Sequence, residues 1–561
     1  MVVFTFFPVG ETGIQKMSSS VFNLLSLNGL PIPLLMLYAE THFRFFSSFP
    51  SLLFKRQPEV LFDLPYRLEP GNDLPILLII NDNNRFPDVP ERVAVAISGN
   101  GTGAEVFPAN DLTALEVSHP LQPDQRAFIY RIPAHRLPEG EFFVTATVTM
   151  RNGGKTYAVI NDNLTTSTKR AFRCFNAPES LPGKGLCVYG DLHIHSQFSQ
   201  SHVEFGPPVR VIDVMAKSCG LSFAGITDHS YDLSCETGDY LKENQSIDRW
   251  NLLQEQLGNP SGLSTVLLPG EEVSCLNANG DTVHLGALNI TGFIPGSADG
   301  ARRNLAFRKS LTLTEAIAEI HRQGGIAFAA HPGSRSGLLQ RLLLHRGSWS
   351  EADMMNELDG IQAFNSGFSP SWERGKVLWL KMLSENRRVP LLAGNDAHGD
   401  FNRYRSIKTP FLNIYEDFQR CMGYGKTGIY GNCLSADEIV RNIKNGATFI
   451  STGPYISINY SENTDDCAIG NQRPEKPVTE LFVHAVTTRE FGRLRTLKVF
   501  SGYPSSPEKL LFQKEFAVET FESISPISLS DLLSASYVRA EVTARGENGG
   551  IHRAYTSACW L

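Results

Sequence analysis

The chain has 561 residues and a mass of 62.0 kDa, and at roughly 150 residues per domain this length predicts three or four domains. Hydrophobic residues make up 42% and charged residues 19% of the chain, which excludes global disorder. The 51 Lys and Arg residues are outnumbered by 58 Asp and Glu residues, giving a formal net charge of −7. This balance excludes the broad basic surface that binding of long nucleic acid requires.

The first 55 residues are rich in Phe and poor in charged residues. They show neither a secretory signal nor an unbroken run of about 20 apolar residues that could span a membrane. We expect a strap packed on the first domain, because large exposed apolar patches are rare in soluble proteins. Contact of residues 1–55 with a membrane or a lipid-like substrate stays open as an alternative.

Nine cysteines are scattered singly, without a C-x-x-C pair. In a large chain this pattern is typical of reduced, buried thiols rather than of a disulfide framework. The sequence therefore favours a reducing compartment, and we expect a cytoplasmic protein. It does not indicate an oligomeric state.

Short strands separated by turns are predicted in residues 56–180, at 75–81, 92–98, 126–132 and 142–150. Asn152-Gly153-Gly154 predicts a hairpin turn into a further strand at 156–160, because Asn and Gly tolerate positive φ. Strands at this spacing, without a helical pattern between them, predict an N-terminal β-sandwich.

Strands alternate with helices in residues 185–453. Thr312-x-x-Glu315 and Ser435-x-x-Glu438 are capping boxes that predict the start of two of the helices. Repeated strand–helix units predict a parallel sheet or barrel with its chemistry at the carboxyl ends of the strands. Strand patterns return in residues 454–561 and predict a C-terminal β-sandwich. The expected fold class is thus α/β in the centre and all-β at both ends.

Histidines and carboxylates follow nearly every predicted strand of the middle region. Alternate residues of a strand point to one side, so His193 and His195 can reach the same ion. The other strand-end groups are His229, Glu272, His331, Asp396 and His398, and His284 begins a strand. Ligands that converge from strand ends can assemble a metal centre.

The candidate ligands are imidazoles and carboxylates, with no cysteine among them. This donor set argues against a closed structural zinc site and suits catalytic Zn²⁺, Mn²⁺ or Fe²⁺. There are too many ligands for one ion, so the sequence predicts two or three divalent metal ions. Glu272 is a candidate bridge between neighbouring ions, which would lower the pKa of a shared water.

These motifs, in this order along residues 187–453, resemble the PHP (polymerase and histidinol phosphatase) family. The resemblance implies a distorted seven-stranded (β/α)7 barrel with a two- or three-metal centre, and Asn365 also fits the family pattern. Gly446–Pro454 and the chain end resemble the branch related to carbaryl hydrolase. By the resemblance, the metal ligands would be His193, His195, His229, Glu272, His284, His331, Asp396 and His398.

One departure from the family concerns the third metal position. Many members place a ligand a few residues after the H-x-H motif, where this chain has Ser199-Gln200 and the nearest candidate is His202. Without His202 as a ligand the site is better interpreted as binuclear. Asp191 and Asp228 are expected to orient neighbouring ligands rather than to bind metal.

The expected activity is hydrolysis of a small-molecule phosphate ester by a metal-bridging hydroxide. Asp396 is expected to accept a proton from the attacking water, and Arg335 is expected to bind phosphate oxygens, since guanidinium groups do so in a bidentate manner. Two alternatives stay open: hydrolysis of a carbamate or carboxylic ester at the same metal centre, and a binding or scaffold protein with an inert centre.

Overall fold

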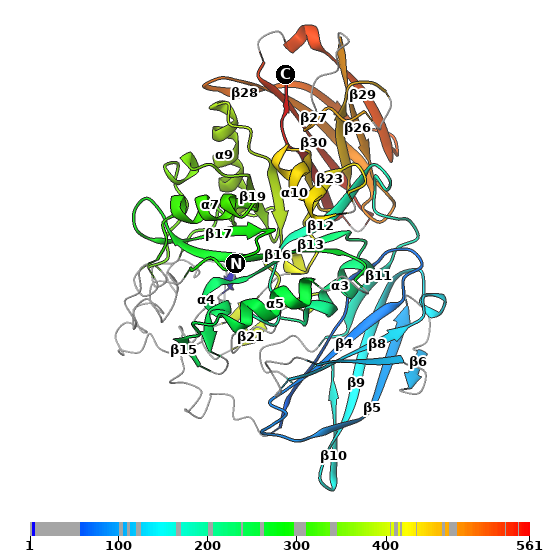
Figure 1. Cartoon of the computed structure of the whole chain (residues 1–561). Helices are drawn as coiled ribbons and strands as arrows, with labels where there is room; N and C mark the ends of the chain where they lie inside the picture. The colour runs from blue at the N-terminus through cyan, green and yellow to red at the C-terminus, as the bar shows by residue number, and fades with distance from the viewer. Residues whose placement is uncertain are drawn as a thin grey trace, which may run out of the picture.

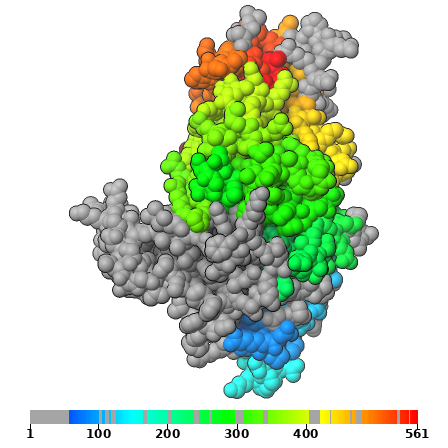
Figure 2. Space-filling model, turned by 60° about the vertical axis from the view of Figure 1, so that its left-hand side comes forward, coloured from blue at the N-terminus to red at the C-terminus, as the bar shows by residue number. Residues whose placement is uncertain are grey.

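The protein is described here by a computed structural model. It describes residues 3–5, 57–99, 105–108, 113–118, 125–163, 170–199, 206–236, 239–258, 263–296, 310–336, 341, 345–403, 406–408, 413–415, 418–433, 435–462, 466–470, 479–532, 535–547 and 549–561. N-terminal strands, the central region and C-terminal strands follow one another along the length of the molecule in two views (Figures 1 and 2).

Two sheets, antiparallel except for one pair of strands, form the N-terminal part. One has the order β2-β4-β8-β7 and consists of Glu59–Asp63, Leu74–Asn81, Arg126–Ile132 and Thr113–Ser118. The other has the order β3-β11-β9-β5-β6, with β10 paired to β9. Its strands are β3 (Arg67–Leu68), β11 (Phe172–Asn176), β9 (Gly140–Asn152), β5 (Val89–Gly99), β6 (Glu105–Pro108) and β10 (Lys155–Ile160).

The two N-terminal sheets share one hydrophobic core, to which β4 contributes Ile76, Leu78 and Ile80. The opposite face of β4 is also buried, because Leu77 and Ile79 belong to the core of the central region. A strand that is apolar on both faces is typical of an inner layer. The N-terminal sheets are therefore packed directly against the part of the chain that follows them.

The central region is built on a 14-stranded sheet with the order β20-β19-β18-β17-β16-β13-β12-β23-β24-β31-β30-β27-β28, and β32 pairs with β30. Its first strands are β12 (Cys187–Ile194), β13 (Phe223–His229), β16 (Val266–Leu276), β17 (Thr282–Leu288), β18 (Ile326–Ala329), β19 (Gly360–Asn365) and β20 (Leu391–Gly394). An isolated bridge between Ile194 and Ala397 brings the segment after β20 back to β12. The sheet is therefore strongly curved, and the ends of β12 and β20 lie side by side.

Six α-helices lie in the described part of the chain: α3 (Val209–Ser218), α4 (Ser230–Leu233), α5 (Asp248–Gly258), α7 (Leu313–Arg322), α9 (Pro370–Ser384) and α10 (Ala436–Lys444). Both predicted capping boxes are confirmed, with Thr312 and Ser435 each accepting a hydrogen bond from the backbone of the Glu three residues later. Short 3-10 turns are found at Ala134–Arg136, Asp353–Met355, Phe418–Arg420 and Leu529–Leu532. None of the helices described here is long and apolar enough to cross a membrane.

The C-terminal strands continue the central sheet. They are β23 (Lys426–Tyr430), β24 (Thr448–Ser451), β31 (Ile551–Thr556), β30 (Tyr537–Arg545), β27 (Arg493–Tyr503), β28 (Ser506–Glu515) and β32 (Cys559–Trp560). A separate three-stranded sheet contains β25 (Tyr455–Asn459), β26 (Glu480–Val486) and β29 (Glu522–Ser528). One hydrophobic core runs from the central strands into these C-terminal strands.

The expected fold class, a central (β/α)7 barrel between two β-sandwiches, is wrong. Among the described residues, strand residues far outnumber helical residues, and the middle strands form a mixed sheet rather than a ring of parallel strands with helical crossovers. β16 pairs antiparallel with β17, and β17 antiparallel with β18. The physical reason is the short turn at residues 277–281, which can join only antiparallel neighbours.

Smaller elements complete the description. The hairpin predicted at Asn152-Gly153-Gly154 is confirmed, since β9 and β10 pair antiparallel on either side of Gly153 and Gly154. Of the Phe-rich residues 1–55, the structure describes only β1 (Val3–Thr5), which pairs with β22 (Asn413–Tyr415) and through it with β21 (Ser406–Lys408). The predicted strap otherwise lies outside the described residues. A two-stranded sheet joins β14 (Cys235–Glu236) and β15 (Asp239–Glu243).

Candidate metal centre

Adjacent strands of the central sheet deliver the first group of candidate ligands. His193 lies in β12 and His195 directly after it, while His229 is the last residue of β13. His229 is the register partner of Glu272 in the parallel pair β13–β16. The side chains of these two residues therefore meet across neighbouring strands.

The direction of β17 explains why a residue near the start of a strand joins residues at strand ends. His284 pairs with Ser274 in the antiparallel pair β16–β17, and Ser274 is two residues beyond Glu272 on the same face. The Nδ1 atom of His284 accordingly lies 2.6 Å from Oε1 of Glu272. A parallel β17 would have carried His284 to the other end of the sheet.

Two further candidate ligands follow β18 and β20 in strained backbone conformations. His331 has φ of 33° and Asp396 has φ of 54°, in the left-handed region that non-glycine residues seldom adopt. Such residues cost of order 1–3 kcal/mol each and persist where the surrounding structure holds them. Asp396 is held by its own backbone, because its N–H donates to the carbonyl of His193 at 2.9 Å.

Gly394, the last residue of β20, permits this close approach. A Cβ atom at Gly394 would lie 2.6 Å from the Cβ atom of His193, nearer than real side chains approach. His195 completes the junction by donating its N–H to the carbonyl of Ala397 at 2.9 Å. The end of β12 and the loop after β20 are therefore locked together, with their ligands side by side.

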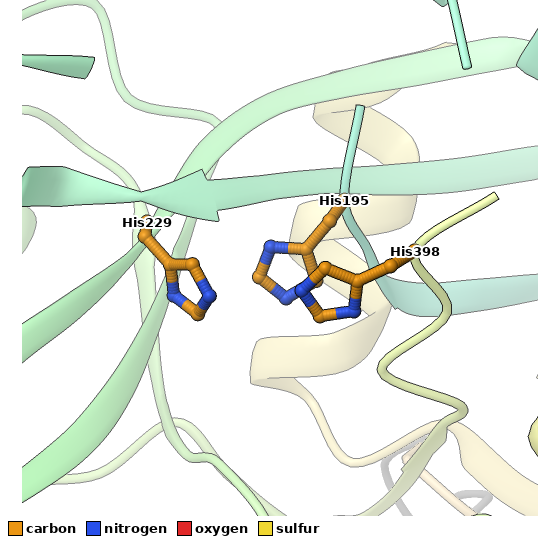
Figure 3. Close-up of side chains that lie close together, drawn as sticks. All are labelled: His195, His229 and His398. Carbon is orange, nitrogen blue, oxygen red and sulfur yellow. The ribbon is translucent and has the colours of Figure 1, made fainter. Parts of the chain in front are cut away.

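The candidate ligands form three overlapping groups, in each of which the ligand atoms lie within 4.8 Å of one another. The groups are His195, His229 and His398; His193, His195, Glu272 and Asp396; and Glu272, His284 and His331. Figure 3 shows the rings of the first group facing one another from β13, the end of β12 and the loop after β20. The rings of His195 and His398 are stacked, with centroids 3.9 Å apart and planes 9° from parallel.

Glu272 belongs to two of the three groups, and its two oxygen atoms face different imidazoles. Oε1 lies 2.6 Å from Nδ1 of His284 and 2.9 Å from Nε2 of His331. Oε2 lies 3.0 Å from Nδ1 of His229, and in the part of the chain that the structure describes these two buried atoms form no hydrogen bond of regular geometry. Buried polar atoms without hydrogen bonds are rare in proteins. Here the two atoms are a carboxylate oxygen and an imidazole nitrogen, both of which can bind a divalent cation.

The contact between His193 and His195 provides a test of whether the residues fit a metal ion. Nδ1 of His193 faces the amide oxygen of Gln362 at 2.8 Å, and Nδ1 of His195 faces the hydroxyl of Ser199 at 3.0 Å. Because Ser199 also hydrogen-bonds the Asp228 carboxylate, its oxygen accepts from His195. Both Nδ1 atoms are thus donors, and both Nε2 atoms carry lone pairs.

Those two Nε2 atoms lie only 3.1 Å apart. Two facing lone pairs repel each other unless a cation lies between them. At metal–nitrogen distances of about 2.0–2.1 Å, two ligands of a tetrahedral ion are separated by roughly 3.3 Å. The carboxylate oxygen Oδ1 of Asp396 lies 3.2 Å from Nε2 of His195, completing a mixed nitrogen and oxygen set. The residues present therefore fit a divalent ion.

The electrostatics of the two carboxylates depend on the surrounding imidazoles. Burial alone would raise the pKa of Glu272, but the nearby His284 and His193 hold that pKa well below its usual range. Burial likewise opposes ionisation of Asp396, whereas His193, His195 and Arg420 hold its pKa well below the ordinary value. Both groups are therefore negatively charged at neutral pH, as metal ligands must be.

The imidazoles differ from one another. Burial lowers the pKa of His195 well below its usual value, helped by neighbouring His398 and His229, and burial also lowers the pKa of His331. For His193 and His229, the carboxylate of Glu272 outweighs burial and raises the pKa. Imidazole binds metal in its neutral form, and His195 adopts that form most readily.

The two aspartates expected to orient ligands contact backbone and hydroxyl groups instead of imidazole rings. Asp191 accepts hydrogen bonds from the N–H groups of His193 and Asn395 and from the side chain of Asn395. Asp228 accepts from the N–H and the hydroxyl of Ser196. Burial raises the pKa of both carboxyl groups. Their role is to fix the strand ends, and Asp228 reaches His195 only through Ser199.

Several residues expected at the site are placed elsewhere. Arg335 is exposed, and among the described residues it has no hydrogen bond or ion pair with the clustered side chains. His202 lies outside the described residues. Asn365 ends β19 and is buried, with no hydrogen-bond partner for its side-chain oxygen in the described part of the chain.

Sequence reasoning missed two arginines and one glutamine. Nη2 of Arg420 lies 3.3 Å from Oδ2 of Asp396, and Nη2 of Arg346 lies 3.1 Å from both ring nitrogens of His284. Neither arginine belongs to a strand-end motif, so no sequence signal singled them out. Gln362 could have been found, because it lies in β19 three residues before the predicted Asn365.

In comparisons with known proteins, no family model matches this chain and no curated protein is significantly similar to it. The resemblance to the PHP family therefore stays a prediction that depends on the ligand motifs.

Proposed function

We propose that this protein is a metal-dependent hydrolase acting on a small phosphate ester. The observation that carries the proposal is the overlap of three groups of buried imidazoles and carboxylates through Glu272 and His195. The ligand motifs shared with the PHP family support it, although the barrel of that family is not part of the proposal. The nine cysteines, scattered singly along the sequence, favour a reducing, cytoplasmic environment.

The exposure of the ligand side chains indicates from which side a substrate enters. Glu272 and His284 are each 1% exposed, whereas His331 is 12% and Asp396 14% exposed. The centre therefore opens toward His331 and Asp396. Arg420, 10% exposed beside Asp396, adds a positive charge on this open side. A guanidinium group in this position suits the anionic oxygens of a phosphate ester.

The chain's own residues divide the work accordingly. Bound divalent cations would supply Lewis acidity and lower the pKa of water. Asp396, ionised and reachable by solvent, receives the proton that the attacking water loses. Arg420 replaces Arg335 as the residue that orients ester oxygens, because Arg420 lies at the centre while Arg335 does not.

The test combines metal removal with a substrate panel. The purified protein is stripped with a chelator and assayed with p-nitrophenyl phosphate, bis-p-nitrophenyl phosphate and an aryl carbamate before and after addition of Mn²⁺, Zn²⁺ or Fe²⁺. Phosphate ester turnover is expected to vanish on stripping and to return with metal. Cleavage of the carbamate alone would assign the centre to that chemistry instead.

Matched histidine variants locate the activity. His331→Ala is expected to lower kcat/KM at least about 100-fold, since it removes a ligand at the open side. His321→Ala is the control, because His321, which lies on α7, pairs with Asp359 and belongs to none of the ligand groups. Turnover that survives thorough metal removal, or that falls equally in both variants, would contradict the proposal.

A further inference from the structure

The loop after β20 carries Asp396 and His398 and then runs directly to the N-terminal sheets. Its next residues, Phe401 and Asn402, are buried at 1% and 5% exposure. The N–H groups of both donate to the carboxylate of Asp63, each at 3.0 Å. Asp63 is the last residue of β2, more than 300 positions away in the sequence.

A second contact attaches the same loop to the other N-terminal sheet. The side-chain amide of Asn402 donates to the carbonyl of Arg173 at 2.8 Å and contacts Sγ of Cys174 at 3.5 Å, both in β11. Phe401 and Asn402 are thus held from two strands, three and four residues after His398.

A third contact reaches the centre by another route. The hydroxyl of Tyr66, which lies between β2 and β3, donates to the carbonyl of Gly423 at 2.8 Å. The N–H of Gly423 donates to the carboxylate of Asp191 at 3.0 Å, and Asp191 in turn holds the backbone of His193. The N-terminal sheets are therefore connected to both sides of the junction between β12 and the loop after β20.

Burial of the Asp63 carboxylate costs free energy, which a purely structural role would not require. It is fully buried, and burial raises its pKa to about 7 despite the nearby Arg403. A buried carboxylate is costly unless its hydrogen bonds are satisfied, and those of Asp63 come from the backbone of Leu64, Phe401 and Asn402. These hydrogen bonds fix the backbone of the loop that carries Asp396 and His398.

We propose that Asp63 is a positioning residue of the metal centre, through which the N-terminal sheets hold Asp396 and His398 in their ligand positions. This inference rests on the proposed function only in assuming that the centre binds metal. It assigns to the N-terminal part a role in the site to which its described residues contribute no ligand.

The ligand groups make the inference specific. Two of the three groups contain a residue of the loop, Asp396 or His398, while the group of Glu272, His284 and His331 contains none. Loss of the Asp63 contacts should therefore weaken metal binding selectively. A general loss of stability would instead weaken all groups together.

The experiment compares Asp63→Ala with Asp88→Ala. Asp88 is a matched control, because it is 1% exposed in the N-terminal sheets and accepts hydrogen bonds from Asn152 and Tyr157, away from the loop. Binding of Mn²⁺ and Zn²⁺ to the full-length protein is titrated against a chromophoric chelator. Asp63→Ala is expected to weaken metal binding by the groups that contain Asp396 or His398 about 10- to 100-fold. The group of Glu272, His284 and His331 is expected to keep its affinity. Asp88→Ala is expected to leave the affinity of every group unchanged.

A second variant guards against poor folding of Asp63→Ala. Asn402→Ala removes the contact to β11 while leaving Asp63 in place, and it is expected to weaken metal binding by the same groups by a smaller factor. Unchanged affinities in both loop variants, or equal losses in the Asp88 control, would overturn the inference. Selective metal loss without any ester hydrolysis by the wild-type protein would sustain the inference while rejecting the proposed function.

Discussion

Glu272 is a carboxylate shared by two of the three ligand groups. One oxygen faces His284 and His331, and the other faces His229. A single carboxylate therefore contacts three imidazole rings. A neutral amide in its place would keep the volume but remove the charge and one of the two acceptor oxygens.

Glu272→Gln is therefore expected to lower the metal content measured by elemental analysis and to reduce kcat/KM for a phosphate ester at least about 100-fold. Glu271→Gln is the control on the same strand. Glu271 points to the opposite face, where it accepts a hydrogen bond from the N–H of Ile294, and it belongs to none of the ligand groups. A variant of Glu272 that retains full metal content would show that the groups do not bind ions through it.

Lys426 is a second residue whose environment has a measurable consequence. It is 2% exposed, and burial together with the nearby Arg67 lowers its pKa to about 8 from an ordinary 10.5. Above pH 8 the folded protein has therefore released a proton that the unfolded chain still holds. Stability contributed by this group must rise with pH between about 8 and 10.5.

Lys426→Met removes that dependence. The free energy of unfolding of the wild-type protein is expected to increase relative to that of the variant by about 1 kcal/mol per pH unit in this range. Urea denaturation of both proteins at pH 7.5, 8.5 and 9.5 measures the difference, in which the titration of buried cysteines and tyrosines cancels. A constant difference across the three pH values would show that Lys426 titrates normally.

At the scale of the elements, sequence patterns located most strands and helices but not how they are joined. The predicted capping boxes begin α7 and α10, and the predicted strand 126–132 is β8 to the residue. Periodicity and capping are local properties, so they can be found without knowledge of the fold. Strand direction and partner choice depend on contacts distant in sequence, which local patterns do not contain.

The expected barrel failed at one identifiable place. Asn277-Ala-Asn279-Gly280 lies between two strand patterns and is a hairpin signal, with Gly280 at φ of 78°. A hairpin predicted from this signal would have made β17 antiparallel to β16, which is incompatible with a ring of parallel strands. The position of His284 at the start of its strand was a second, independent sign of the same reversal.

The candidate site was more accessible to sequence reasoning than the fold was. Strand-end histidines and carboxylates are placed by short motifs, and the structure brings eight of them into overlapping groups. Arg420 was not predictable, because it lies in a 3-10 turn, Phe418–Arg420, outside any motif. Asp63 was hidden for a related reason: its partners are backbone N–H groups, which leave no trace in the sequence pattern.

At the scale of the whole molecule, Arg67 connects three regions that are far apart in the chain. It lies in β3, and its guanidinium group contacts Glu490 at 2.9 Å and Glu69 at 2.6 Å. The same group donates to the carbonyl of Cys219, next to the end of α3. With its side chain only 1% exposed, it is a buried cation held by two carboxylates.

Buried ion pairs add little stability over apolar packing, but loss of one partner leaves an uncompensated charge. Arg67→Met is therefore expected to lower the free energy of unfolding by about 3–5 kcal/mol, because Glu490 and Glu69 lose their counter-ion. The double variant Arg67→Met/Glu490→Gln is expected to recover part of that loss, since it removes one of the stranded charges. Urea denaturation monitored by tryptophan fluorescence measures both values, with the single variant Glu490→Gln completing the cycle. If Arg67→Met cost less than about 1 kcal/mol, or if the double variant were no more stable than Arg67→Met, the ion pairs of Arg67 would not contribute to holding the N-terminal sheets to the rest of the molecule.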